Sequence, residues 1–434
     1  SLVRDVNGDS YADLLISTPN NDDVGNDAGK IYLFSGAALT DGTYSVDTAP
    51  LQILGELAGD LAGSSISSAG DIDGDERFDI LIGAPFNDDA GNAAGKAYLF
   101  RGSSLGVGTI SVQSADITFT GENLIDLAGS HVATAGDIDD DGYDDILIGA
   151  EYSDTGGNRS GQVYLFLGSG LSATTYNLSE ADTSFYGENA EDQMADAQTA
   201  GDVDGDGLDD IIIGSMYNDD GGSDAGKAYL VYGSSITQTS LPISLSDLAF
   251  VGESQEDYAA SAIKGCGDVN GDGLEDLLIG AYGHDANGED SGKTYLITNS
   301  SMLTSAISLS NATTYFYGES SQDRSGFSLD SVGDLDNDGY REVIIGAPNN
   351  SEVQSNAGKV YVYYSSSIGT GAHPLADADL SYTGISSNNY LGSAITAPGD
   401  LNNDGIKDLV LGAPGHNANG ANTGRVHIFL NPFE

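Results

Sequence analysis

Seven short segments of this chain carry Asp or Asn at alternate positions, followed four residues later by a final carboxylate. In the pattern Asp-x-[Asp/Asn]-x-Asp-x-x-x-[Asp/Glu], a tight loop turns oxygen atoms from alternate residues toward one point, and the last carboxylate can bind in bidentate fashion. We expect the backbone carbonyl of the seventh position to add another oxygen. Calcium prefers such all-oxygen sets, whereas magnesium demands a stricter octahedron and zinc calls for His or Cys. The spacing therefore predicts one calcium site in each segment, up to seven ions in all.

The predicted ligands occupy the same register in every loop: four side chains and, at the seventh position, a carbonyl. They are Asp5, Asn7, Asp9, Tyr11 and Asp13; Asp71, Asp73, Asp75, Arg77 and Asp79; Asp137, Asp139, Asp141, Tyr143 and Asp145; Asp202, Asp204, Asp206, Leu208 and Asp210; Asp268, Asn270, Asp272, Leu274 and Asp276; Asp334, Asp336, Asp338, Tyr340 and Glu342; and Asp400, Asn402, Asp404, Ile406 and Asp408. The alternative is that these residues only form Asx turns at strand ends. Seven loops in register, each with at least three carboxylates that repel one another when unfilled, favour metal binding.

The sixth position of the loop differs between repeats. It is Gly in five loops, but Ser10 and Glu76 in the first two. A left-handed backbone at this position costs more with a side chain than with glycine. We therefore expect the first two sites to be weaker or differently shaped.

The loops recur at a nearly constant interval, which identifies a repeat architecture. They start at Asp5, Asp71, Asp137, Asp202, Asp268, Asp334 and Asp400, so the interval is 66 residues five times and 65 once. Each loop is followed by a short apolar run such as DILIGAP at 79–85, and then by a second strand such as GKAYLF at 95–100. A third strand ends in Gly-Glu, and a small-residue strand such as AGSSISSAG at 62–70 leads back to the next loop. Four strands per repeat are typical of a β-propeller blade; a β-solenoid, the alternative, usually has much shorter coils.

The sequence thus predicts an all-β fold, a seven-bladed β-propeller of four-stranded blades that forms a single domain over residues 1–434. The first and last blades each lack one strand in this chain, namely the small-residue strand and the Gly-Glu strand. A segment upstream of Ser1 would supply both strands and close the ring, and closure protects strand edges that would otherwise aggregate. Otherwise another chain must supply them, or the edges stay open.

The charge balance limits the possible partners. The chain has 67 acidic and 14 basic residues, for a formal charge of -53. Nucleic-acid binding is disfavoured, because phosphate contacts need clustered Lys and Arg, and so is an anionic membrane surface. No run approaches the roughly 18 apolar residues of a membrane span. This much like charge calls for counterions, which again points to calcium and to a saline or calcium-rich medium.

Six of the basic residues occupy one repeat position, at the start of the second strand after each loop. They are Lys30, Lys96, Lys227, Lys293, Lys359 and Arg425. A residue that recurs in this way is expected to be structural, and we predict that it pairs with a carboxylate of a neighbouring strand or loop.

Three aspartate loops are followed by a strand that ends in an intact Gly-Ala-Pro, at 83–85, 346–348 and 412–414. Over nearly its whole length the chain resembles the FG-GAP repeat family, whose best-known members are the propellers of integrin α-subunits. The family's opening Phe-Gly is only approximated here, by Gly326-Phe327 and Leu391-Gly392. The resemblance implies that a calcium loop connects the first and second strands of each blade, on one face, and that ligands and partner subunits approach the opposite face.

Three classes of function remain open, because the fold alone cannot choose among them. They are an extracellular binding or cell-adhesion module, a structural subunit of a surface layer or filament formed by self-assembly, and the non-catalytic propeller of a larger hydrolase or lyase. No nucleophile–base pair stands out and the histidines are scattered, so we predict no enzymatic activity. We favour an extracellular or cell-surface module in which calcium stabilises the blades and the opposite face binds a protein or carbohydrate ligand.

Overall fold

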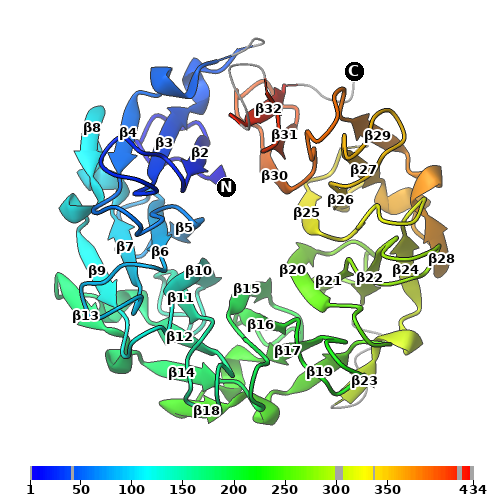
Figure 1. Cartoon of the computed structure of the whole chain (residues 1–434), viewed down its shortest axis with the longest axis horizontal. Coiled ribbons are helices and arrows are strands. Elements are labelled where there is room, and N and C mark those ends of the chain that lie inside the picture. Colours follow the sequence, from blue (N-terminus) through cyan, green and yellow to red (C-terminus); the bar gives the residue numbers. More distant parts are fainter. Residues whose placement is uncertain (1, 41–43, 299–305, 336–337, 418–422, 431–434) are drawn as a thin grey trace.

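The chain forms a ring of seven sheets around one axis in a computed structural model (Figure 1). The structure describes residues 2–40, 44–298, 306–335, 338–417 and 423–430. Each sheet runs outward from the axis, with its first strand innermost and its last strand at the rim. Within these residues the helical segments are three-residue 3-10 turns. The predicted all-β, seven-bladed propeller is confirmed.

The sheets have the following strands, from the axis outwards. They are β1 (Leu2–Val3), β2 (Asp13–Thr18), β3 (Lys30–Ser35), β4 (Leu51–Leu54) and β8 (Gly108–Ser111); β5 (Ser65–Gly70), β6 (Asp79–Ala84), β7 (Lys96–Phe100), β9 (Ile117–Thr120) and β13 (Thr175–Asn177); β10 (Ala128–Gly136), β11 (Asp145–Ala150), β12 (Gln162–Phe166), β14 (Thr183–Tyr186) and β18 (Ser240–Pro242); β15 (Asp196–Gly201), β16 (Asp210–Ser215), β17 (Lys227–Val231), β19 (Leu248–Val251) and β23 (Ala306–Ser308); β20 (Ala259–Gly267), β21 (Asp276–Ala281), β22 (Lys293–Ile297), β24 (Thr314–Tyr317) and β28 (Gly371–Pro374); β25 (Ser328–Val332), β26 (Glu342–Ala347), β27 (Lys359–Tyr363) and β29 (Leu380–Thr383); and β30 (Ala394–Gly399), β31 (Asp408–Ala413) and β32 (Arg425–Phe429).

The second strand of each blade is an uninterrupted apolar run because neighbouring blades cover both of its faces. Every residue of β6 is buried, and its side chains belong to two clusters that join the second blade to the first and to the third. Gly83, near the end of β6, faces the next blade so closely that a Cβ there would lie 2.0 Å from the carbonyl oxygen of Gly129. Glycine is therefore required at this point of closest approach between blades.

A fifth, outermost strand in each of the first five sheets was not predicted from the sequence. It comes from the following repeat and pairs in parallel with the fourth strand, as β8 does with β4. The strand is only three or four residues long, and β8 is half-buried or exposed throughout. Such a segment has no apolar run that would identify it, yet it ties each blade to the next at the rim.

The first and seventh sheets pack against each other where the ring meets itself (Figure 1). Leu14 and Phe34 of the first sheet share a buried cluster with Leu401 and Val410 of the seventh. The side chain of Asn403 also donates a hydrogen bond to the carbonyl oxygen of Ser10, at 3.1 Å. Contacts within the chain therefore hold these two blades together.

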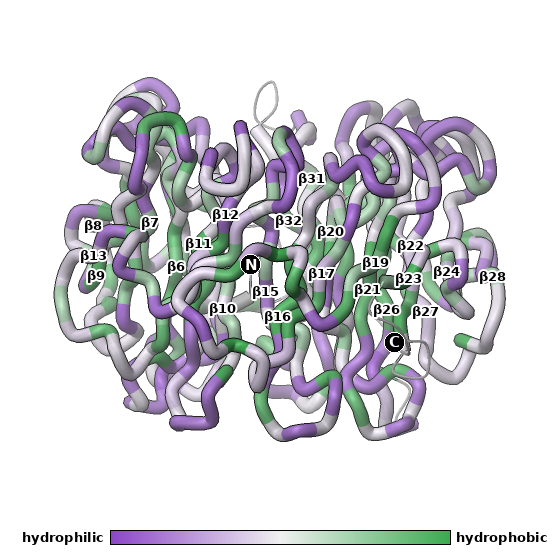
Figure 2. Tube along the Cα trace, turned by 90° about the horizontal axis from the view of Figure 1, so that it is seen from below, coloured by the Kyte–Doolittle hydropathy of each residue, from purple (hydrophilic) through white to green (hydrophobic). Residues whose placement is uncertain are grey.

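The loops of the blades fall on two opposite faces of the ring. The predicted aspartate loops all connect the first strand of a blade to the second, and we call their side the aspartate face. The loops between the second and third strands lie on the other side, which we call the lysine face because Lys30, Lys96, Lys227, Lys293 and Lys359 begin the third strands. Figure 2 shows the strands between two layers of loops, in which purple, hydrophilic segments alternate with shorter hydrophobic ones.

Candidate metal centres

The first aspartate of each loop holds the backbone of its own loop. One oxygen of Asp71 accepts hydrogen bonds from the N–H groups of Gly74 and Asp75, at 2.8 and 3.0 Å, and the other accepts from Glu76 at 2.8 Å. Equivalent bonds form at Asp5, Asp137, Asp202, Asp268, Asp334 and Asp400. These bonds are those of an Asx turn, so by themselves they fit either interpretation of the loops.

The last carboxylate of each loop lies in the core. Asp79 is 0% exposed and accepts hydrogen bonds from the N–H groups of Ile72 and Gly102, at 3.0 and 2.8 Å. Burial is the main reason that the pKa of Asp79 is raised to about 7, and the nearby charges of Asp73 and Asp71 raise it further. Burial likewise raises the pKa to about 7 at Asp13, Asp145, Asp210 and Asp276. Forming a turn does not require a buried carboxylate, whereas a bound cation would offset the cost of burying it.

The structure brings three of the four predicted acidic side chains together in each of four loops. Their oxygen atoms all lie within 4.8 Å of one another in the groups Asp71, Asp73 and Asp79; Asp137, Asp139 and Asp145; Asp202, Asp204 and Asp206; and Asp334, Asp338 and Glu342. Calcium–oxygen distances of about 2.3–2.6 Å allow oxygens around one ion to be at most about 5 Å apart. The four groups therefore fit a calcium ion. The predicted ligand Asp336 lies outside the described residues, and the role of the seventh-position carbonyls stays a prediction.

The second loop contains a buried oxygen that its protein surroundings leave unsatisfied. Oδ1 of Asp73 is buried and has no hydrogen-bond partner, while Oδ2 lies 3.1 Å from Nε of Arg101. Among the described residues, Arg101 is the one basic side chain that forms an ion pair with a predicted ligand. An unsatisfied carboxylate oxygen of this kind is costly unless a cation binds it.

Three loops have an asparagine at the third position. Its side-chain amide donates hydrogen bonds to carboxylates of the same loop, which an aspartate at this position does not do. The side-chain N–H2 of Asn7 donates to both oxygens of Asp13, at 3.1 and 3.2 Å. Asn270 donates to Asp272 and Asp276, and Asn402 donates to Asp404. A half-turn of the amide would exchange its nitrogen for its oxygen, so these loops can still offer an oxygen ligand.

The sixth position is left-handed in the loops with a side chain there as well as in those with glycine. Ser10 has φ 71° and Glu76 has φ 68°, close to φ 90° at Gly142. The first two loops therefore do not differ in backbone shape at this position, and a weaker affinity of their sites stays a prediction. A non-glycine residue in this conformation costs about 1 kcal/mol.

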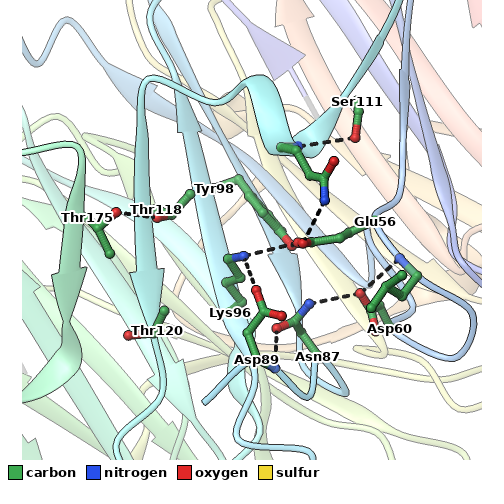
Figure 3. A network of polar contacts seen from close by, with 12 residues as sticks. Glu56, Asp60, Asn87, Asp89, Lys96, Tyr98, Ser111, Thr118, Thr120 and Thr175 are labelled. Atoms are coloured by element: carbon green, nitrogen blue, oxygen red, sulfur yellow. Dashed lines mark hydrogen bonds and ion pairs between the residues drawn. The ribbon is translucent and has the colours of Figure 1, made fainter. Parts of the chain in front are cut away.

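Lysines neutralise four recurring glutamates of the lysine face, Glu56, Glu188, Glu253 and Glu319, and Figure 3 shows the network around the first of them. Nζ of Lys96 lies 3.0 Å from Glu56 and 2.6 Å from Asp89, and the hydroxyl of Tyr98 donates to Glu56 at 2.8 Å. Glu56 belongs to the preceding repeat, so the network joins two blades. Lys227 and Lys359 bind two carboxylates in the same way, and Lys30 and Lys293 bind one each. The predicted structural pairing of the lysines is therefore confirmed for these five.

Sequence reasoning missed the acidic partners of this network. They share the pattern Gly-Glu-x-x-x-Asp, as in GELAGD at 55–60 and GESSQD at 318–323. The glutamate binds the next blade's lysine, and the buried aspartate accepts a hydrogen bond from an asparagine, as Asp60 does from Asn87 at 2.8 Å (Figure 3). The constant spacing of Glu and Asp was the signal that could have identified them.

A row of aromatic rings crosses three blades at the strand ends of the lysine face. The ring centroids of Tyr217 and Tyr258 are 6.0 Å apart, those of Tyr258 and Tyr282 are 5.2 Å apart and nearly parallel, and those of Tyr282 and Phe327 are 5.7 Å apart. The guanidinium of Arg324 lies 5.6 Å from the ring of Tyr282. Phe327 is 40% exposed, and the three tyrosines are partly buried. We call these four rings the aromatic row.

Seven radial sheets with an acidic loop between the first and second strands define a β-propeller with candidate cation loops. The chain belongs to the FG-GAP repeat family, whose model matches residues 1–34, 62–100, 128–166, 199–231, 266–297, 326–363 and 392–429, together more than half of the chain. Each match includes a whole aspartate loop. This membership agrees with the resemblance inferred from the Gly-Ala-Pro motifs.

The chain is similar to parts of integrin α-subunits. It is 30% identical over 261 residues to integrin alpha pat-2 of Caenorhabditis briggsae, covering 58% of this chain and 20% of the relative. It is 31% identical over 223 residues to integrin alpha-PS2 of Drosophila melanogaster, covering 50% of this chain and 15% of the relative. The chain thus spans a fifth or less of the length of these relatives. No helix among the described residues is long and apolar enough to cross a membrane.

The fold is also similar to that of a solved structure. A crystal structure of BBS1N in complex with ARL6DN aligns with a TM-score of 0.51 and 12% identity, over 99% of this chain and 91% of that chain. At this level of identity the likeness concerns the fold alone.

Proposed function

We propose that this chain is an extracellular or cell-surface calcium-binding propeller that acts as a binding module in adhesion. The observation that carries the calcium assignment is the buried, unsatisfied Asp73 oxygen beside the fully buried Asp79. Arg101 pairs with the other oxygen of Asp73, which leaves Oδ1 without a partner. The names of the integrin α relatives and the FG-GAP repeats support the adhesion role.

Calcium in these loops would supply positive charge that the chain itself does not provide. Asp71 orders the loop backbone through three hydrogen bonds, and Asp79 connects the same loop to the core through Ile72 and Gly102. Holding both carboxylates at one point would therefore fix the start of β6 relative to the loop. We infer that the cation stabilises the blade and plays no part in a reaction.

The lysine face is the surface we assign to a protein or carbohydrate ligand. Its recurring lysines, glutamates and aspartates already satisfy one another, so a ligand is expected to contact the residues that differ between repeats. The aromatic row is such a set, because Tyr, Arg and Phe stand there in only some blades. Aromatic side chains bury a large area at low conformational cost, which suits a contact surface.

Thermal unfolding in excess calcium and in EDTA tests the calcium assignment. A ligand at a hundred times its Kd stabilises the folded state by about 2.7 kcal/mol per site, so several filled loops should raise Tm strongly. Equal melting curves in calcium and in EDTA would contradict the proposal. A matching test of the ligand face replaces Tyr258 and Phe327 by Ser: binding to immobilised matrix proteins or oligosaccharides should fall, while the calcium-dependent gain in Tm stays.

A further inference from the structure

Successive aspartate loops are joined to one another by hydrogen bonds around the ring. The N–H of the eighth residue in one loop donates to the carbonyl oxygen of the first residue in the preceding loop. This bond links Phe78 to Asp5, Asp144 to Asp71, Asp209 to Asp137, Glu275 to Asp202 and Arg341 to Asp268, at 3.0 to 3.5 Å. The eighth residue directly precedes the last predicted ligand. Adjacent loops are therefore in contact through residues next to their ligands.

Two of these contacts have a second bond made by a side chain. Oδ2 of Asp144 accepts the N–H of Asp71 at 2.7 Å, and Oδ2 of Asp209 accepts the N–H of Asp137 at 3.1 Å. Both backbone groups of the first ligand are thus held by a single residue of the next loop. Neither Asp144 nor Asp209 belongs to a predicted ligand set, and the sequence offered no reason to select them.

The residue before Asp71 and the residue before Asp137 are both glycines in the left-handed conformation. Gly70 and Gly136 have φ 80° and 79°. A Cβ at Gly70 would lie 2.3 Å from Oδ2 of Asp144, and one at Gly136 would lie 1.9 Å from Oδ2 of Asp209. Glycine therefore lets the neighbouring carboxylate reach the backbone.

We propose that Asp144 and Asp209 are positioning residues that couple cation binding in the second, third and fourth loops. A cation held by Asp145 orders the adjacent Asp144, and Asp144 fixes the backbone of Asp71, the first ligand of the loop before it. The same chain of contacts runs from Asp210 through Asp209 to Asp137. Coupling of this kind is reciprocal, so a filled loop favours filling of its neighbour in either direction. The inference rests on the proposed calcium function.

The sixth and seventh loops provide the internal comparison. The eighth residue of the seventh loop is Lys407, whose side chain has no oxygen to accept a hydrogen bond from Asp334. Among the described residues, no hydrogen bond between Lys407 and Asp334 is present. Cation binding in the sixth loop is therefore expected to be insensitive to the seventh.

Terbium titration of the whole chain tests the coupling. Terbium takes calcium-type oxygen sites and emits when a nearby tyrosine is excited. Tyr143 belongs to the third loop and its ring also lies against Gly74 of the second loop, so the emission that disappears in Tyr143→Phe reports these two loops. Replacing the exposed Asp204 and Asp206 by Ala disables the fourth loop and should raise the Kd of this emission about fivefold or more. In Asp209→Leu the same replacement should have no effect, and in Asp209→Asn, which keeps an acceptor oxygen, the effect should return.

The control uses the emission that disappears in Tyr340→Phe, which reports the sixth loop together with the fifth, because the Tyr340 ring lies against Gly271. Replacing Asp404 by Ala in the seventh loop should leave the Kd of this emission unchanged. An unchanged Kd of the Tyr143-dependent emission when Asp209 is intact, or an equal rise in Asp209→Leu, would overturn the coupling while leaving the calcium assignment in place. Absence of any emission that depends on Tyr143 or Tyr340 would overturn the calcium assignment and the coupling with it.

Discussion

The two faces of the ring hold carboxylates in different surroundings. On the lysine face, Glu56 and Asp89 both bind Lys96, and a tyrosine hydroxyl adds a further bond. On the aspartate face, Asp71 and Asp79 are near other carboxylates and bind backbone N–H groups instead of lysines. Lysines of the chain thus neutralise four glutamates of the lysine face, whereas on the described part of the aspartate face Arg101 alone pairs with a predicted ligand. The difference indicates that external cations matter most on the aspartate face.

The third blade shows a neutral version of the lysine-face network. Gln162 stands where five other blades have lysine and the seventh has arginine. Its amide oxygen accepts hydrogen bonds from Ser153 and Thr155 at 2.9 and 2.7 Å. Ser153 and Thr155 occupy the places of Asn87 and Asp89 in the second blade. The cation and the loop carboxylate are therefore both replaced. This blade has the same strand arrangement as the others. Either ion pairs or neutral hydrogen bonds can therefore satisfy the polar side chains at the start of the third strand.

The largest effect of a single substitution is expected for Lys96→Met. Glu56 would lose the cation that offsets its burial, and breaking a buried ion pair lowers the free energy of unfolding by about 3 kcal/mol. The pair with Asp89 adds little, because that side chain is half-exposed. The matched change Gln162→Met removes only neutral hydrogen bonds and should cost about 1 kcal/mol. Denaturant unfolding measures both. The loss of unfolding free energy in Lys96→Met should be the same in calcium and in EDTA. A loss seen only in calcium would contradict the conclusion that the ion pairs of the lysine face are independent of external cations.

The reverse pattern is expected for Asp139→Ala on the aspartate face. In EDTA the variant should unfold like the parent or slightly later, because the substitution removes a carboxylate that repels Asp137 and Asp141. In calcium it should lose the contribution of one site, about 2.7 kcal/mol at a hundredfold excess over Kd. The control Asp220→Ala removes an exposed partner of Lys227 on the lysine face. Its effect should be small and independent of calcium.

The features that could be predicted from the sequence are those that depend on residues close together in the chain. The ligand spacing inside a loop and the buried second strands follow from residues within one repeat, and the number of blades follows from counting the repeats. The missed features depend on contacts between repeats: Asp144 binds a residue 73 positions away, and β8 pairs with a strand of the preceding blade. A single repeat gives no indication of which side chain its neighbour will meet. The direction of the Asn7 amide also depends on whether a cation or a carboxylate faces it.

A smaller, pH-dependent effect should come from the lysine face. Asp192 and Asp323 bind asparagine amides instead of lysine, and burial raises the pKa of each to about 6. Between about pH 4 and pH 6 the folded chain binds these protons more tightly than the unfolded chain, so each group lowers stability as pH rises through that range. Between pH 4 and pH 6 the loss is about 2 kcal/mol per group.

Unfolding in EDTA across this pH range isolates that contribution. Asp323→Asn keeps the acceptor oxygen for Asn350 and Ser320 but cannot ionise. Its stability should therefore fall less between pH 4 and pH 6 than that of the parent. Glu352→Gln, at a half-exposed position that pairs with Lys359, serves as the control and should leave the slope unchanged in this range. A slope in Asp323→Asn equal to that of the parent would contradict the assignment.

The smallest effect is expected at the sixth position of the second aspartate loop. Glu76 is exposed and left-handed, so Glu76→Gly removes backbone strain and should raise stability by about 1 kcal/mol. Gly207→Ala makes the opposite change at the same position of the fourth loop, where φ is 95°, and should lower stability by a similar amount. If strain is the cause, the gain at Glu76 appears in EDTA as well as in calcium, because the left-handed turn is present without a cation. A gain confined to calcium would instead attribute the effect to the charge of Glu76 beside the metal site.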